Sequence, residues 1–97
     1  MGVETRPFEP DKYFQTPEAQ AHLLTEAMAS GDAGHIADAV GIIARARGVG
    51  ELARQTGLNR QGLYAALSEA GNPTLSTLLK VLDVLDLELT VRPKTAA

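Results

Sequence analysis

Apolar residues recur every three to four positions through most of the chain, a spacing typical of helices that bury one face. Near the C-terminus the pattern changes to strict alternation over Leu87–Val91, which indicates a half-buried strand. The sequence therefore predicts an all-α domain with one added strand. Its five helices are expected at residues 17–30, 33–47, 50–56, 59–68 and 74–85.

Residues that commonly cap helices stand at the expected boundaries. Thr16 precedes Pro17 at the first helix, Asp32 and Thr74 precede two others, and Gly31 follows the first. Each helix should present an apolar stripe to a shared core. The inward positions are expected to be Ala21, Leu23, Leu24, Ala27, Met28, Ile36, Ala39, Val40, Ile43, Ala44, Leu52, Ala53, Leu58, Leu63, Ala66, Leu67, Leu75, Leu78, Leu79, Leu82 and Leu85.

Residues 1–15 lack a helical period and contain Pro7 and Pro10, so we expect an extended N-terminal arm. Three of the four aromatic residues of the protein, Phe8, Tyr13 and Phe14, fall within it. They either fold back onto the helical body or dock onto a partner protein, with the arm ordering as it binds.

The alternating segment at the C-terminus would be a strand with no partner in its own chain. Such an edge is satisfied when the same strand of a second copy pairs with it across a two-fold axis. Leu87, Leu89 and Val91 would then form a homodimer contact, and residues 92–97 a flexible tail. The alternative is an irregular segment packed on the core.

Residues 50–68 have the pattern of a helix-turn-helix motif. Two short helices are separated at Thr56-Gly57-Leu58, where glycine provides the backbone freedom of a tight turn, and Asn59 is placed to cap the second helix. In such motifs the second helix lies in the DNA major groove. A helical hairpin without a DNA role is the alternative. The residues left on the outward side are Arg54, Asn59, Arg60, Gln61 and Tyr64.

Composition indicates one globular domain: the chain has 97 residues, of which 44% are apolar. The absence of cysteine removes disulfides and thiolate chemistry. Neither a signal peptide nor a membrane span is recognisable, so a cytoplasmic location is expected. The net charge of -3 argues against a non-specific nucleic-acid binder, yet the acidic excess lies before Val49. Arginines at 45, 47, 54 and 60 surround the motif.

Enzymatic chemistry has little support in the sequence. His22 and His35 lie on different predicted helices without carboxylates at ligand spacing, so no metal site is expected. The serines have no adjacent base, and no glycine pattern is suited to cradling phosphate. We therefore expect a non-enzyme without cofactors.

Two stretches make the likeness to a known family specific. Five helices with the motif in the middle resemble the lambda-repressor-like domains. The run from ARARG through GL and LY, followed by GNPT and a leucine-rich helix, resembles the probable addiction-module antidote proteins, a HigA-like group of antitoxins. The likeness extends from about Arg6 to Val91.

This resemblance implies two activities. Such antitoxins neutralise a small RelE- or HigB-like toxin that cleaves mRNA, and they repress the operon that encodes both proteins. The aromatic arm residues would bind the toxin. A homodimer would place two recognition helices in successive major grooves of operator DNA, about 34 to 36 Å apart.

The resemblance also implies which residues meet DNA. The base contacts fall to Asn59, Arg60, Gln61 and Tyr64, with Arg60 suited to guanine and Gln61 to adenine. Thr56, Ser68, Arg45 and Arg47 are candidates for phosphate contacts, although the two arginines also suit the end of a helix electrostatically. Two other functions remain open: a stand-alone, prophage-type regulator without a toxin, and an interaction module without DNA binding.

Overall fold

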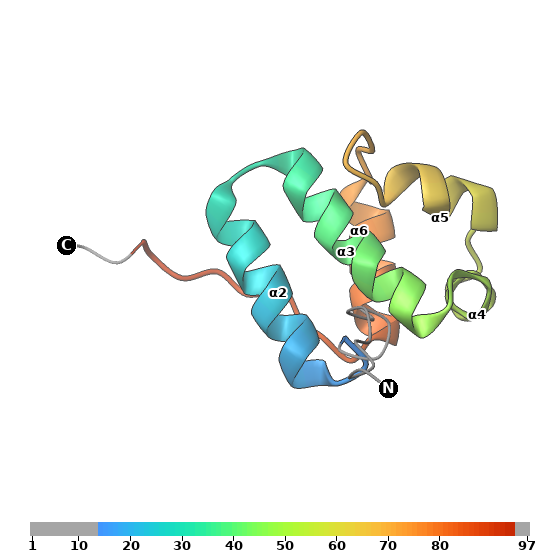
Figure 1. Ribbon diagram of the computed structural model, residues 1–97, viewed down its shortest axis with the longest axis horizontal. Coiled ribbons are helices and arrows are strands. Elements are labelled where there is room, and N and C mark those ends of the chain that lie inside the picture. The colour runs from blue at the N-terminus through green and yellow to red at the C-terminus, as the bar shows by residue number, and fades with distance from the viewer. Residues whose placement is uncertain (1–13, 95–97) are drawn as a thin grey trace, which may run out of the picture.

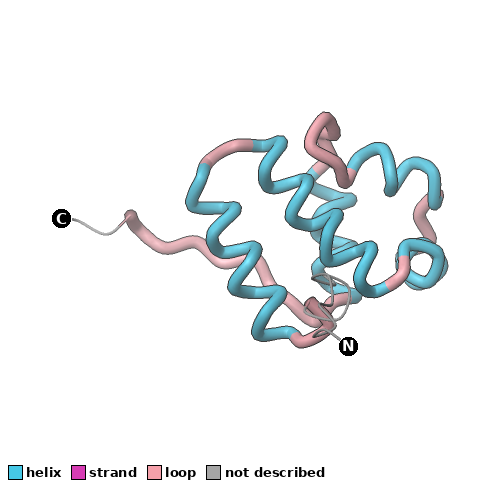
Figure 2. Tube along the Cα trace, in the orientation of Figure 1, coloured by secondary structure: helices cyan, strands magenta, loops and turns pink. Residues whose placement is uncertain are grey.

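Five α-helices make up the ordered body of the protein in the computed structural model, which describes residues 14–94 (Figure 1). No strand occurs among these residues (Figure 2). Within the same range, no helix is both long and apolar enough to cross a membrane. The helices are α2 (Pro17–Ser30), α3 (Ala33–Arg47), α4 (Val49–Thr56), α5 (Arg60–Ala66) and α6 (Leu75–Val84).

The ends of the helices lie where the capping residues predicted them. The Thr16 side chain accepts a hydrogen bond from the amide of Ala19 (3.2 Å), and Asp32 accepts one from the amide of His35 (3.0 Å). Gly31 ends α2 in the left-handed conformation, with a φ of 69°. The predicted body of five helices is therefore confirmed, with ends that differ from the predicted ones by one or two residues, as at Val49, Ala66 and Val84.

Helix α4 lies at the centre of the packing: it contacts α3, α5 and α6, while α2 covers the opposite side of α3. Leu52 of α4 is completely buried, as are Val40 and Ile43 of α3 and Val81 of α6. One continuous apolar core thus joins helices from both halves of the chain. Its members are Leu24, Ala27, Ala39, Val40, Ile43, Ala44, Val49, Leu52, Ala53, Leu63, Leu67, Val81, Leu82 and Leu85.

The segment after α5 lies directly against the backbone of α3. A Cβ placed on Gly41 would be 2.0 Å from the carbonyl oxygen of Leu67, and one on Gly34 would be 2.6 Å from that of Glu69. Two glycines seven residues apart lie on one face of a helix, with the small, buried Ala37 between them, so the following segment can approach the α3 backbone at both glycines. This close approach sets how deeply the C-terminal end of α5 sits on the domain.

Three residues expected to face inward are exposed instead. Ala21 points to solvent, and buried Gln20 takes its place on the inner face of α2. Leu75 and Leu79 of α6 are 64% and 45% exposed, because the helix packs through Val81, Leu82 and Leu85. The leucine stripe of α6 is wider than one packing face, and periodicity does not tell which edge of it meets the core.

The predicted C-terminal strand is absent from the described structure, and that prediction was wrong for the single chain. Residues 87–94 run out as a loop (Figure 2). Leu87 packs against the core, whereas Leu89 is 42% and Val91 96% exposed. A strand is defined by hydrogen bonds to a neighbouring strand, and no other described segment offers one.

Most of the predicted N-terminal arm, including Phe8 and Tyr13, lies outside the described residues. Phe14 is half-buried, and its carbonyl oxygen accepts a hydrogen bond from Nε2 of Gln20 (2.8 Å). Gln20 is 4% exposed, so this bond satisfies a buried amide and attaches the end of the arm to α2.

Gly41→Ala should destabilise the fold. Its methyl group has no room against the Leu67 carbonyl, so α5 or α3 must shift; overpacking of this kind typically destabilises by about 1–3 kcal/mol. Urea denaturation followed by circular dichroism measures the free energy of unfolding.

Gly62→Ala is the matched control. A Cβ there would meet only the Asn59 side chain, at 3.7 Å, and alanine is favoured over glycine within a helix by about 1 kcal/mol. We expect stabilisation. If both variants changed stability in the same direction, the close approach at Gly41 would not be the cause.

Candidate nucleic-acid interface

A tight turn joins α4 to α5. Gly57 ends α4 in the left-handed conformation (φ 74°), and its amide donates to the Ala53 carbonyl at 2.8 Å. The Thr56 hydroxyl donates to the carbonyl of Leu52 (2.8 Å) and accepts from the amide of Leu58 (3.2 Å). The turn is thus internally hydrogen-bonded, and Leu58 covers the core between the two helices.

Helix α5 has one buried and one exposed side. Leu63 and Leu67 are each 2% exposed and anchor the helix in the core. Arg60, Gln61 and Tyr64 lie on the solvent side, where the sequence predicted a surface for reading DNA. The fold therefore presents a polar row on a helix whose other side is fixed.

Asn59 caps α5 as predicted: its Oδ1 accepts a hydrogen bond from the amide of Gly62 at 2.8 Å. The first helical turn leaves backbone amides without partners, and this bond satisfies one of them. Part of the hydrogen-bonding capacity of Asn59 is consequently used within the protein. Its amide group remains available on the exposed side of the residue.

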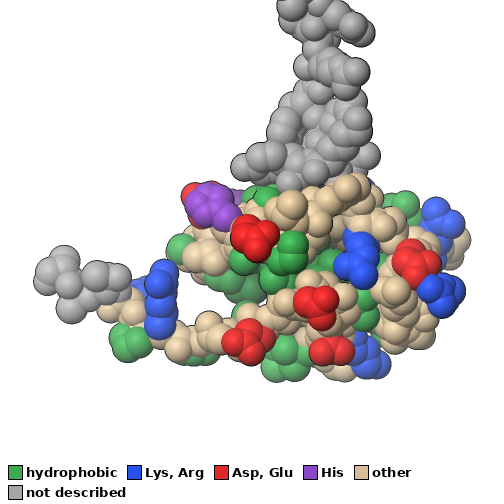
Figure 3. All heavy atoms as spheres, turned by 90° about the horizontal axis from the view of Figure 1, so that it is seen from below, with side chains coloured by type: hydrophobic (Ala, Val, Ile, Leu, Met, Phe, Trp, Pro, Cys, Tyr) green, Lys and Arg blue, Asp and Glu red, His purple; other side chains and the backbone are tan. Residues whose placement is uncertain are grey.

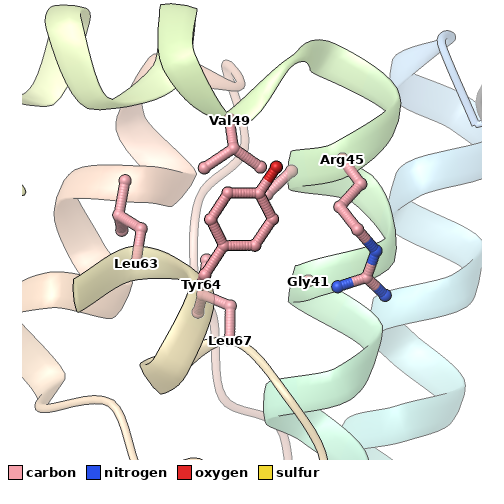
Figure 4. A pocket seen from close by; sticks show the side chains of 7 residues that line it. Gly41, Arg45, Val49, Leu63, Tyr64 and Leu67 are labelled. Atoms are coloured by element: carbon pink, nitrogen blue, oxygen red, sulfur yellow. The ribbon is translucent and has the colours of Figure 1, made fainter. Parts of the chain in front are cut away.

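Arg60, Tyr64 and Arg45 gather on one face, where α5 meets α3. The Arg60 guanidinium carbon lies 5.8 Å from the centre of the Tyr64 ring, a cation–π geometry. Tyr64 and Arg45 line a shallow depression (Figure 4). Its other lining residues are Gly41, Ala44, Val49, Leu63 and Leu67.

Tyr64, 45% exposed, therefore has an apolar floor, the Arg60 guanidinium over its ring and Arg45 among the lining residues. The Tyr64 ring lies beside Val49 and Leu67 (Figure 4). The Arg60 guanidinium lies over the same ring, and a cation–π contact at such an exposed site contributes about 0.5–1 kcal/mol.

Arg54 is engaged by Glu51 on the outer side of α4. Arg54 Nε donates to Glu51 Oε1 (3.2 Å), and its Nη2 forms a second bond to the same carboxylate. The hydrogen bond from Arg54 lowers the pKa of Glu51, with further lowering by the charges of Arg54 and Arg47. The same pair raises the pKa of Arg54. Arg54 is thus an arginine of the motif region whose guanidinium already forms an ion pair within the protein.

The two hydroxyl residues predicted to contact phosphate donate their protons within the protein. Thr56 bonds to Leu52 as described, and the Ser68 hydroxyl donates to the Ala65 carbonyl at 3.0 Å. Arg45 and Arg47, by contrast, are exposed at the end of α3. The guanidinium groups are consequently better placed than the hydroxyls to donate to an external phosphate.

Charge is distributed unevenly over the described surface. On the face seen from below, most Lys and Arg side chains lie toward the end that holds α4 and α5, with an acidic group among them, and others lie on the C-terminal segment. Further acidic groups occupy the middle (Figure 3). No group of three or more potential metal-ligating side chains occurs among residues 14–94.

Comparison with known proteins places the chain in a family. Residues 4–93 match the family model described as "Probable addiction module antidote protein". An uncharacterized protein of Haemophilus influenzae is 36% identical over 92 residues, which are 95% of each chain. The chain belongs to the probable addiction module antidote proteins. No solved structure gives a significant match.

Three features of this antidote-family chain were not predicted from its sequence. They are the hydrogen bond that Gln20 donates to the Phe14 carbonyl (the Gln20 clamp), the face of α3 around Gly34 and Gly41 against which the chain after α5 packs (the glycine surface of α3), and the Glu51–Arg54 ion pair. Two of them had a usable signal: Gly34 and Gly41 share a helical face, and Glu51 and Arg54 are three residues apart on α4. The Gln20 clamp had none, because glutamine is normally an exposed residue.

Asn59→Ala should destabilise the domain by about 1 kcal/mol, because the first turn of α5 loses its capping acceptor. Asn59→Asp keeps an oxygen at the same place and should retain most of the stability. Thermal unfolding of the two variants beside the wild type measures the difference. Equal losses in both would show that the cap hydrogen bond is not what stabilises the start of α5.

Proposed function

We propose that the protein is the antitoxin of a type II toxin–antitoxin module, of the HigA-like kind. It binds and neutralises a RelE- or HigB-like, mRNA-cleaving toxin, and as a homodimer it represses its own operon. Membership of the antidote family over residues 4–93 supports the antitoxin half of the proposal. The DNA-binding half rests on the structure of α4 and α5.

The observation that carries DNA binding is the exposed row of α5. Helices α4 and α5 act as a lambda-repressor-like helix-turn-helix, and α5 is the recognition helix. Arg60, Gln61 and Tyr64 lie outward, while Leu63 and Leu67 fix the opposite side. A helix in the major groove needs this division, because its contacts to base edges depend on a rigid backbone position.

Each residue of the interface has a chemically suited role. Arg60 donates two hydrogen bonds to guanine O6 and N7, and Gln61 pairs with adenine N6 and N7. Tyr64 reaches a phosphate or a thymine methyl group. Arg45 and Arg47 contact the phosphate backbone, which positions the protein without specifying the sequence.

The acidic balance of the chain is compatible with this role. Non-specific affinity for DNA comes from neutralised phosphates, so a chain of net charge -3 with only a few exposed arginines should bind random DNA weakly. Sequence-specific contacts then supply a larger share of the operator affinity. A strong dependence on base sequence and a small salt dependence are expected together.

Arg60→Ala should weaken operator binding by about 1–3 kcal/mol and relax the preference at one base pair. Arg54→Ala is the control, because the Arg54 guanidinium is paired with Glu51. Gel shifts on the DNA upstream of the gene, with each base pair of the bound site varied in turn, provide the measurement.

Three other results of that experiment would each contradict a different part of the proposal. A uniform loss across all sequences would make Arg60 a phosphate contact. Equal losses in the Arg60 and Arg54 variants would contradict the assignment of α5 as the reading helix. Absence of any wild-type shift at low salt, with the toxin still neutralised, would leave an interaction module without DNA binding.

Deletion of residues 1–13 should abolish neutralisation of the toxin and leave operator binding intact. The deletion spares Phe14, whose carbonyl is held by Gln20, so the helical body keeps its attachment. The measurement is growth of cells that express the neighbouring toxin gene together with each antitoxin variant, with pull-down of the toxin as the direct assay.

Phe8→Ala and Tyr13→Ala in the full chain test the aromatic contacts separately. Retained toxin binding after the deletion would place the interface on the described helices. Absence of a toxin gene beside the antitoxin gene, together with operator binding, would instead favour a stand-alone regulator.

A further inference from the structure

Residues 88–94 form no backbone hydrogen bond to any other described residue, and they run past α2 away from the helical body (Figure 1). Just before them, the amide of Leu87 donates to the carbonyl of Leu82 and completes the end of α6 (2.9 Å). The segment that follows thus leaves the core with its backbone groups free for a partner.

Side chains of this segment alternate strictly in character. The odd positions 87, 89, 91 and 93 carry Leu, Leu, Val and Pro, and the even positions 88, 90, 92 and 94 carry Glu, Thr, Arg and Lys. In an extended conformation all four apolar groups would lie on one face. Leu87 already packs on the core, so that face continues an existing apolar surface.

The alternation restricts how two copies can pair. In an antiparallel pair related by a two-fold axis, opposed residue numbers have a constant sum. An odd sum would oppose apolar to polar side chains on the same face, so only registers centred on a residue keep the apolar face intact. Registers centred on Glu88 or Arg92 bring identical charges together and are disfavoured.

Of the registers centred on Leu89, Thr90 or Val91, the one centred on Thr90 brings Glu88 opposite Arg92. Glu88 then faces Arg92 of the second copy, and by symmetry Arg92 faces Glu88, so two opposite-charge pairs form on the polar face. Leu89 faces Val91 on the apolar face, and the two Thr90 side chains face each other. Each of these combinations is favourable between antiparallel strands.

The single proline also fits this register. Hydrogen-bonded and non-hydrogen-bonded pairs alternate along an antiparallel ladder. With Thr90 opposite Thr90 as a hydrogen-bonded pair, Glu88–Arg92 is hydrogen-bonded too, and Pro93 falls opposite Leu87 in a non-hydrogen-bonded pair. The missing amide hydrogen of Pro93 is then not needed, and the apolar Leu89–Val91 pair occupies the closer spacing.

We propose that two copies of this chain pair through residues 87–93 as an antiparallel two-stranded ribbon centred on Thr90, with reciprocal Glu88–Arg92 pairs that fix its register. The partner of this segment is thus the same segment of a second copy of the chain. The inference rests on the homodimer of the proposed function and names its interface. It also explains why the alternation of a strand appears in a segment that pairs with no strand among residues 14–94.

Charge reversal tests the register. Glu88→Arg opposes two arginines at both ends of the ribbon, and Arg92→Glu opposes two glutamates, so each should raise the dimer dissociation constant by about tenfold or more. The double variant restores both pairs and should return to the wild-type value. An equimolar mixture of the two single variants should form heterodimers, because each mixed pair is again Glu with Arg.

Analytical ultracentrifugation of the full chain, without DNA or toxin, measures the dimer dissociation constant of each variant and of the mixture. Glu69→Arg is the control for net charge, since Glu69 is exposed in the loop after α5. All substituted side chains are exposed, so circular dichroism should show an unchanged fold. Thr90→Pro removes two ladder hydrogen bonds and should also dissociate the dimer.

Several results would overturn the proposal. One is a wild type that stays monomeric at all concentrations. Others are a Glu88→Arg dimer as stable as the wild type, and a double variant whose dissociation constant does not return to the wild-type value. Dissociation by Leu79→Glu but not by Glu88→Arg would place the second copy on the exposed side of α6. A monomer that still shifts operator DNA and neutralises the toxin would refute the ribbon alone, whereas a ribbon dimer that does neither would refute the proposed function alone.

Discussion

Burial of α4 is the constraint on which the remaining structure depends. The helix has eight residues, too few to be stable alone in water, and Gly48, which precedes it, offers no capping side chain. Its stability comes from Leu52, which is completely buried where α3, α5 and α6 meet. Loss of this contact would separate α5 from α3 and α6 together.

Helix α5 is shorter still, with seven residues, and it depends on the same contact. Leu63 and Leu67 join it to the core around α4, and the glycine surface of α3 receives the chain just after it. Its exposed row is therefore positioned from three directions: the turn at Gly57, the core beneath, and α3 at its end. A binding surface built from so short a helix is precise only because neighbouring elements hold it.

The sequence predicted those parts of the fold that depend on local chemistry. Four of the five helix starts could be read from the caps Thr16, Asp32, Asn59 and Thr74, because each cap acts within three residues of itself, whereas α4 has no side-chain cap. The packing of the helices against one another was harder to predict from the sequence. Leu75 and Leu79 belong to the same stripe as buried Leu82, and only the direction from which α4 approaches decides which of them are covered.

The candidate site divides in the same way. The outward placement of Arg60, Gln61 and Tyr64 followed from the positions of Leu63 and Leu67 on the opposite face. Which other side chains near the site already form hydrogen bonds or ion pairs within the protein could not be predicted, because that depends on their individual partners. The pairing of Arg54 with Glu51 and the internal bonds of Thr56 and Ser68 lower the number of groups free to meet a ligand.

Gly62 shows how stability and binding differ in what they require of α5. It lies inside the helix on the exposed side, and a Cβ there would find ordinary contact at 3.7 Å, so no packing within the described protein calls for glycine. Alanine would favour the helix by about 1 kcal/mol. If α5 is the recognition helix that we propose, the missing side chain next to Arg60 and Gln61 would let a groove wall approach the backbone where those side chains reach base edges. The core beneath α5 offsets the lost helix propensity.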